Sequence, residues 1–163
     1  MRRTSAGRFA LLAAAFVAVF SVAPAAAAAF DANGVALGAS EDDIKKRFPS
    51  AYCKPLEWAS RAAERRCDDS RVAFGGIDAS ITFYLKGDAL EGFDVRVDKR
   101  EFDRMTQFLR KAYGQPVEES ADPARVTWKN RAEHALLTAE QGRRRTSLLV
   151  WRGTFLDEIY KVR

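Results

Sequence analysis

The chain contains two cysteines, and their separation in the sequence decides which chemistry they can perform. Thirteen residues separate Cys53 from Cys67, and the chain has no other cysteine. A redox pair needs two thiols in a Cys-x-x-Cys arrangement, so that one can attack the mixed disulfide formed by the other. A structural zinc site needs about four ligands, and the chain offers only one histidine besides the two thiols. We therefore expect one structural disulfide, worth about 3 kcal/mol by chain entropy.

Residues suited to catalysis are few. A nucleophile needs a base beside it, and the only histidine, His134, precedes an alternating stretch in a way that is typical of an exposed loop or strand end. The adjacent acids 42–43 and 118–119 resemble a glycosidase pair only in composition, since such neighbours are usually solvated. The pair Gly75-Gly76 lacks the Lys-Ser/Thr sequel of a phosphate loop. We expect no enzyme activity, catalytic residue, cofactor or metal site.

A run of three arginines is the most concentrated positive feature. At a hairpin tip it is typical of edge protection, and the functional alternative is an anchor for an acidic partner or for envelope phosphate groups. Tryptophan and arginine dominate binding hot spots, so the tryptophan inside the predicted disulfide loop is either packed or an interface anchor. The candidate partner-contact residues are Trp58, Tyr84, Arg143, Arg144, Arg145 and Trp151.

The first 29 residues have the three parts of a signal peptide. Arginines at positions 2, 3 and 8 precede an apolar stretch over residues 9–23, and an alanine run closes the segment at residues 25–29. The apolar centre is about 15 residues long, short of the roughly 20 that a membrane-spanning helix needs. We expect export by general secretion to the periplasm (or outside a cell without an outer membrane) and no membrane span in the mature protein. A retained anchor is the alternative.

Removal of this segment changes the charge. The chain carries 27 Lys+Arg against 22 Asp+Glu, a net charge of +5. Three arginines and no acid lie within residues 1–29, which leaves 24 against 22, or +2. So small an excess creates no strong field for phosphates, and we do not expect nucleic acid binding. The remaining residues, about 134, suit one domain.

Helix and strand signals then occur in two rounds. Ser40 and Asp43 form a capping box for a short helix that ends near Pro49. Residues 57–66 are ambiguous between a helical turn and an exposed loop. Strand patterns follow at residues 71–74, 81–85 and 90–97, the last two forming a hairpin.

The second round begins at Asp98, which with Glu101 has the spacing of another capping box. An amphipathic helix runs to Gly114, where we expect a left-handed C-terminal residue. Strands near residues 126–128, 135–140 and 146–152 come next, and residues 154–163 predict a closing helix.

Short matches support a duplication. Residues 51–55 match 112–116, and residues 71–74 match 125–128, in the same order. We therefore expect one α+β domain over residues 30–163, with repeat one over about 34–97 and repeat two over about 98–153. Its two αβββ units would form a two-layer sandwich, an antiparallel sheet with the helices on one face. The strand at 146–152 has apolar side chains on both faces. The face without helices is therefore either buried at the centre of the fold or an exposed apolar surface that can bind a partner.

The unit that begins at residues 37–44, with its short helix, proline turn and three-stranded meander, resembles the small outer-membrane assembly lipoprotein (small protein A-like) family. In tandem the units resemble the β-lactamase inhibitory protein-like fold. The lipid-bearing cysteine of the lipoprotein family is absent here. The resemblance implies a scaffold for protein contacts. We expect a periplasmic interaction module with an unidentified protein partner in the cell envelope, such as an inhibitor or accessory of an envelope enzyme. The alternative is a small-ligand or lipid carrier.

Overall fold

The computed structural model describes residues 29–139, 142 and 144–161. Most of the predicted signal peptide, Arg143 and the last two residues of the predicted closing helix lie outside the described residues. Among those described, no helix has the length and apolar character needed to cross a membrane.

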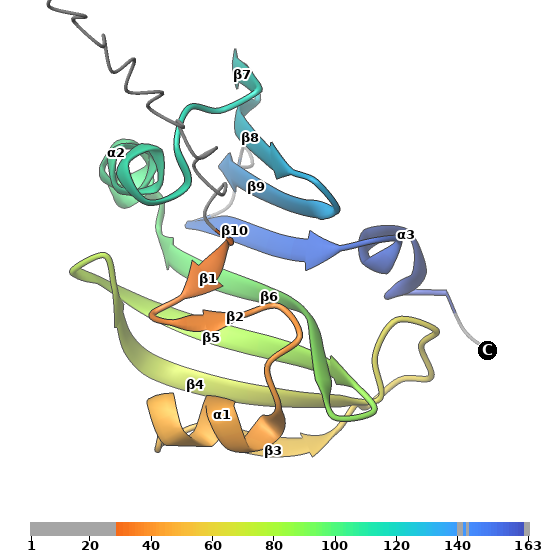
Figure 1. Cartoon of the computed structure of the whole chain (residues 1–163). Coiled ribbons are helices and arrows are strands. Elements are labelled where there is room, and N and C mark those ends of the chain that lie inside the picture. Colours follow the sequence, from red (N-terminus) through yellow and green to blue (C-terminus); the bar gives the residue numbers. More distant parts are fainter. Residues whose placement is uncertain (1–28, 140–141, 143, 162–163) are drawn as a thin grey trace, which may run out of the picture.

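One large antiparallel sheet dominates the fold (Figure 1). Its eight strands lie in the order β3–β4–β5–β6–β10–β9–β8–β7, and β1 and β2 form a separate small hairpin. In chain order the elements are β1 (Asp31–Ala32), β2 (Val35–Ala36), α1 (Glu41–Arg47), β3 (Tyr52–Pro55), β4 (Arg65–Phe74), β5 (Ile77–Lys86), β6 (Ala89–Asp98), the 3₁₀ helix η1 (Lys99–Glu101), α2 (Phe102–Tyr113), β7 (Glu118–Ala121), β8 (Ala124–Asn130), β9 (Glu133–Ala139), β10 (Arg145–Arg152) and α3 (Phe155–Glu158).

One face of the sheet, here called the covered face, packs under α1, α2 and the β1–β2 hairpin. Ile44 of α1 and Leu109 of α2 join a single apolar cluster with alternate residues of the central strands, and both are 0% exposed. Period-2 alternation places these strand side chains on one side of the sheet. The predicted α+β mixture with an antiparallel sheet is confirmed, while the interpretation as duplicated αβββ units in a sandwich stays a prediction.

The helix ends agree with the sequence at α1 and differ at α2. The predicted capping box of α1 is confirmed, because Ser40 and Asp43 bond reciprocally. The second box does not form: Asp98 accepts from the Arg100 amide and caps η1, so α2 starts after a tighter turn. Gly114 ends α2 with a positive φ of 87°, as expected, but its ψ of −161° lies outside the predicted left-handed helical region. This combination of φ and ψ is open essentially to glycine alone.

Each half of the sheet has one more strand than expected. The short edge strands β3 and β7 were not predicted, because proline and charged residues mask their pattern. Strand β4 begins at Arg65, six residues before its predicted start, and a bulge between Asp69 and Val72 interrupts its alternation. Residues 56–64 form a loop that is not wholly exposed, since Ala63 is 2% exposed.

The C-terminal segment leaves the end of β10 and forms α3 (Figure 1). Its buried side chains pack with Tyr84 and Leu149 on the other face of the sheet, here called the open face. Phe155 and Ile159 are buried there, as their helical spacing predicted. The helix itself is only four residues long, much shorter than the predicted 154–163.

Candidate functional site

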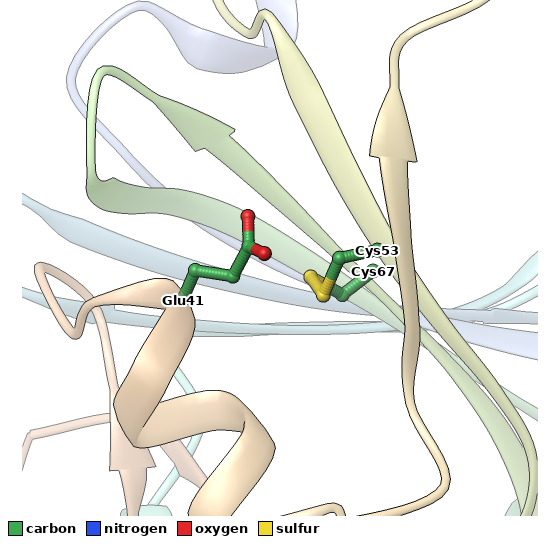
Figure 2. A group of neighbouring side chains, drawn as sticks. All are labelled: Glu41, Cys53 and Cys67. Atoms are coloured by element: carbon green, nitrogen blue, oxygen red, sulfur yellow. A yellow bond between two sulfur atoms is a disulfide. The ribbon is translucent and has the colours of Figure 1, made fainter.

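The cysteines and a neighbouring carboxylate make the tightest cluster of potential metal ligands in the part of the chain that the structure describes. The ligand atoms of Glu41, Cys53 and Cys67 lie within 4.8 Å of one another, and Figure 2 shows the Glu41 carboxylate beside the sulfurs. The two cysteines face each other across β3 and β4 and form the predicted disulfide. Because both sulfurs are bonded, neither is a thiolate that can bind a metal.

Glu41 has partners of its own. Arg65 Nε donates to Glu41 Oε2 over 2.8 Å, and Lys45 Nζ donates to Oε1 over 2.6 Å. These hydrogen bonds, that from Arg65 first, lower the pKa of the Glu41 carboxyl below 4.5. The cluster therefore ties α1 to β4 beside the disulfide, which is a structural role.

His134 is the second residue of β9, so it lies at a strand end, one of the two predicted placements, and not in a loop. Its ring is half-buried and stacks on Trp151 of β10, with centroids 5.2 Å apart and an interplanar angle of 15°. Its cross-strand neighbours are Trp151 and Lys129. In the described part of the chain no hydroxyl is hydrogen-bonded to the imidazole, so the nucleophile–base contact of a triad is not formed there.

The two predicted acid pairs also have structural contacts. The Asp43 carboxylate completes the α1 capping box by accepting from the Ser40 amide, and it also accepts from the Ser40 hydroxyl. These bonds, that of the hydroxyl first, lower the pKa of the Asp43 carboxyl. Glu119 on edge strand β7 forms an ion pair with Arg110 of α2.

The open face presents two rows of side chains across its central strands. In the first, Arg96 lies between Ser80 and Ser147, and the row continues through Thr138 to Arg125. In the second, the order is Thr82, Asp94, Leu149, Leu136 and Thr127. Directly opposed residues have Cβ atoms about 5 Å apart. The open face thus combines hydroxyls, guanidinium groups and an apolar pair.

Two adjoining hollows lie on this face near the β9–β10 turn. One, of about 450 Å³, has Leu136 and Leu149 at its floor together with Thr138 and Ser147. The other, of about 710 Å³, extends over β4 and β5 and includes Arg71. Arg96, Arg144 and Arg145 line both hollows. We call this pair of hollows the arginine hollow.

Arg96 is held in place by a buried acid. Its Nη2 lies 2.7 Å from Asp94 Oδ2, and Asp94 is 6% exposed. The Ser147 hydroxyl donates to the same carboxylate. The charge of Asp94 is the first cause of the raised pKa of Arg96. This network fixes one guanidinium at the centre of the open face while half of its surface stays exposed, at 52%.

The other end of the open face is covered by α3 and the 56–64 loop. Phe155 packs over Tyr84, with centroids 5.6 Å apart, and occupies the space above Gly92. The Trp58 indole donates to the Ile159 carbonyl over 2.9 Å, and its ring stacks on Tyr160. A smaller hollow of about 210 Å³ separates this cap from Asp94 and Arg96.

The predicted partner-contact residues therefore fall into two groups. Trp58, Tyr84 and Trp151 belong to the cluster around α3, where Tyr84 is only 7% exposed and the tryptophans are half-buried. Arg144 and Arg145 are exposed at the opposite end of the open face. Sequence reasoning missed Arg96, Leu136, Thr138, Ser147 and Leu149 as members of one surface. Their period-2 spacing was visible, but the strand register that aligns them was not.

A scan against protein-family models finds no match for this chain, and searches of curated proteins and of solved structures find none that is significantly similar. The geometry of the open face therefore carries the functional proposal.

Proposed function

We propose that the protein is an exported interaction module of the cell envelope that binds a protein partner on the open face of its sheet. The observation that carries the proposal is the arginine hollow, where Leu136 and Leu149 are half-buried beside arginine side chains. Interfaces combine such apolar floors with arginine and polar rims. The disulfide supports export, because such bonds persist in oxidising compartments.

The scaffold we infer for this module is a pair of related units in a two-layer sandwich. Each half of the chain runs helix, then four strands, and the last strands of the two halves, β6 and β10, pair at the centre of the sheet. This order supports the predicted duplication and the resemblance to the small outer-membrane assembly lipoprotein family and, in tandem, to the β-lactamase inhibitory protein-like fold. A pair of such units implies a rigid surface for protein contacts and assigns no catalytic residue.

Site-specific photocrosslinking of the protein, produced from the complete chain in its native envelope, tests this proposal. A photoreactive residue at Leu136 reports on the open face, and one at Gln107, exposed on α2, is the matched control. We expect position 136, and not position 107, to give a single crosslinked adduct with one partner protein. The purified partner should bind the wild-type protein at a 1:1 ratio and should not bind the Leu136→Arg variant. Equal adducts from both positions, or none from position 136, would contradict the proposal.

An inhibitor of an exported hydrolase is the specific form that the resemblance favours. Activity assays of lysozyme-like and β-lactamase enzymes with micromolar protein address it directly. Inhibition that Leu136→Arg removes would support it, and unchanged activity would exclude these enzyme classes as targets.

Carriage of a small ligand or lipid is the second candidate. A groove of about 520 Å³ lies between α2 and strands β7 and β8, with Phe102 and Val126 among its lining residues. The Arg110–Glu119 ion pair lies at this groove. A thermal shift with a lipid and metabolite panel, lost in Ala121→Arg at the exposed rim of the groove, would favour the carrier. Unchanged melting across the panel counts against it.

A further inference from the structure

The arginine hollow carries more positive charge than its own acids neutralise. Four arginines, at positions 71, 96, 144 and 145, line it, against the lining aspartates Asp78 and Asp98 and the buried Asp94 that pairs with Arg96. Asp98 is already paired with Arg100. Among the described residues no carboxylate forms an ion pair with the side chain of Arg71, Arg144 or Arg145. The surface therefore has guanidinium groups whose donors are available to a ligand.

The donors converge on a place with an apolar floor. Arg96 is fixed by Asp94, and its row neighbours Ser147 and Thr138 carry hydroxyls on the same face. One row further along lies the Leu149–Leu136 pair. A planar guanidinium donates two parallel hydrogen bonds to a carboxylate, and adjacent leucines accommodate an apolar side chain. An acidic side chain next to an apolar one fits both parts.

We propose that the arginine hollow binds a segment of a protein partner in which acidic side chains alternate with apolar side chains such as leucine, and that the arginines recognise the carboxylates of that segment. This inference rests on the proposed function and names the chemistry of the partner at that same surface. A protruding peptide segment fits the geometry better than a lipid surface does. The side chains of a protruding segment can reach the Leu136–Leu149 pair inside the hollow, whereas a layer of anionic headgroups offers charge and no apolar side chain for that pair.

Titration of the isotopically labelled protein, produced from the complete chain, with two blocked peptides tests the inference by NMR. One peptide alternates glutamate with leucine, and the other has glutamine at every glutamate position. We expect the glutamate peptide to shift the amides of β6, β9 and β10 around Arg96 and Ser147. The glutamine peptide should bind at least about tenfold more weakly, because each charge-assisted pair contributes more than a neutral hydrogen bond.

Two charge-reversal variants supply the matched comparison. Arg144→Glu/Arg145→Glu removes two exposed arginines of the hollow, and Lys46→Glu/Lys111→Glu makes the same change in net charge on the helix side. We expect at least about tenfold weaker peptide binding in the first and less than about twofold in the second. Raising the salt concentration should weaken the wild-type interaction, since exposed charges are screened.

Several results would overturn the inference. Equal binding of the two peptides, equal loss in the two reversal variants, or no amide shifts at all would each exclude carboxylate recognition at this place. Inorganic phosphate or phosphatidylglycerol vesicles that bind the same residues more tightly than the glutamate peptide would assign the hollow to phosphate ligands. Arg144→Glu/Arg145→Glu could also leave the affinity for the partner crosslinked at position 136 unchanged. That result would support the proposed interaction module and exclude only the recognition of an acidic segment.

Discussion

The covered and open faces of the same strands have opposite compositions. On β10, Leu148 and Val150 point to the covered face and are 0% exposed, while Ser147, Leu149 and Trp151 alternate with them and are half-buried. The covered face has α1, α2 and the β1–β2 hairpin packed upon it, whereas α3 and the 56–64 loop cover one end of the open face. The covered face therefore supplies most of the apolar burial that stabilises the fold, which leaves the open face free to carry charge and hydroxyls.

The largest effect should come from a cavity on the covered face. Phe93, at the centre of β6, is 0% exposed and lies 6.1 Å from the Phe83 ring centroid. We expect Phe93→Ala to lower the free energy of unfolding by about 3–5 kcal/mol, because the removed ring leaves a cavity among packed side chains. Urea denaturation followed by tryptophan fluorescence measures it. Leu136→Ala on the open face is the comparison, and a loss as large as that of Phe93→Ala would contradict the division of roles.

Removal of the disulfide should have the next largest effect. Cys67 belongs to the covered-face cluster, and the loop that the bond closes carries Trp58 to the α3 cap on the open face. We expect Cys53→Ala/Cys67→Ala to lose about 3 kcal/mol, mainly by freeing the unfolded chain. Denaturation of the wild-type protein with and without reductant should show the same difference, and the double variant should not respond to reductant. A loss below 1 kcal/mol, on the order of a surface contact, would show that the bond adds little to this fold.

The sequence was informative where one face of an element is uniformly buried. Period-2 spacing at Ile81 and Phe83, and the helical spacing of Met105 and Leu109, predicted the strand and helix that form the covered face. Local chemistry also identified the α1 capping box and the disulfide. Each of these features depends on residues close together in the sequence or on a pairing with no competitor.

The open face was harder to predict, because its members come together only through strand register. Arg96 and Arg125 lie three strands apart in one row, a relation that depends on three successive pairings. The edge strands β3 and β7 were missed because edge positions tolerate proline and charge. Tyr84 was expected at a partner contact, but it is buried by Phe155 of the α3 cap, which lies 71 residues further along the chain.

Tyr84, buried under the α3 cap, makes the stability of the fold depend on pH in alkaline solution. Burial, followed by the charge of Asp94, raises the pKa of Tyr84 to about 12 from its ordinary 10. The folded state therefore keeps a proton that the unfolded state loses above pH 10. The contribution of Tyr84 to the free energy of unfolding is fully present below pH 10. It should fall by up to about 1.4 kcal/mol per pH unit between pH 10 and 12.

Tyr84→Phe should make the alkaline loss less steep, because phenylalanine has no proton to lose, while Tyr113, whose pKa is also raised by burial, keeps its own share. Urea midpoints at pH 8, 10 and 11 measure the difference, on the order of 1 kcal/mol at pH 11. Tyr52→Phe is the matched control, since the Tyr52 side chain is 69% exposed at the edge strand. Identical alkaline slopes in wild type and Tyr84→Phe would show that the α3 cap does not desolvate the phenol.

The smallest effect should come from Gly92, where the cap meets the sheet. A Cβ at this position would lie 2.9 Å from the Phe155 ring, closer than carbon atoms pack, so Gly92→Ala must displace the ring. We expect a loss near the low end of the 1–3 kcal/mol that overpacking costs, about 1 kcal/mol, because the displaced segment is a single short helix and not a packed sheet. A change in Trp58 fluorescence should accompany it, since the indole bonds to Ile159 in the same segment.

The double variant Gly92→Ala/Phe155→Ala separates this clash from other effects of the new methyl group. If the cap is displaced as a unit, the alanine at position 92 should cost little once the ring at position 155 is removed, so the two losses will not add. The loss of stability caused by Phe93→Ala should be the same in the Gly92→Ala and Phe155→Ala variants as in the wild type, because the Phe93 side chain packs on the covered face. Additive losses of stability at positions 92 and 155 would mean that the methyl group strains the β6 backbone itself. The cost of Gly92→Ala would then come from the sheet and not from displacement of the α3 cap.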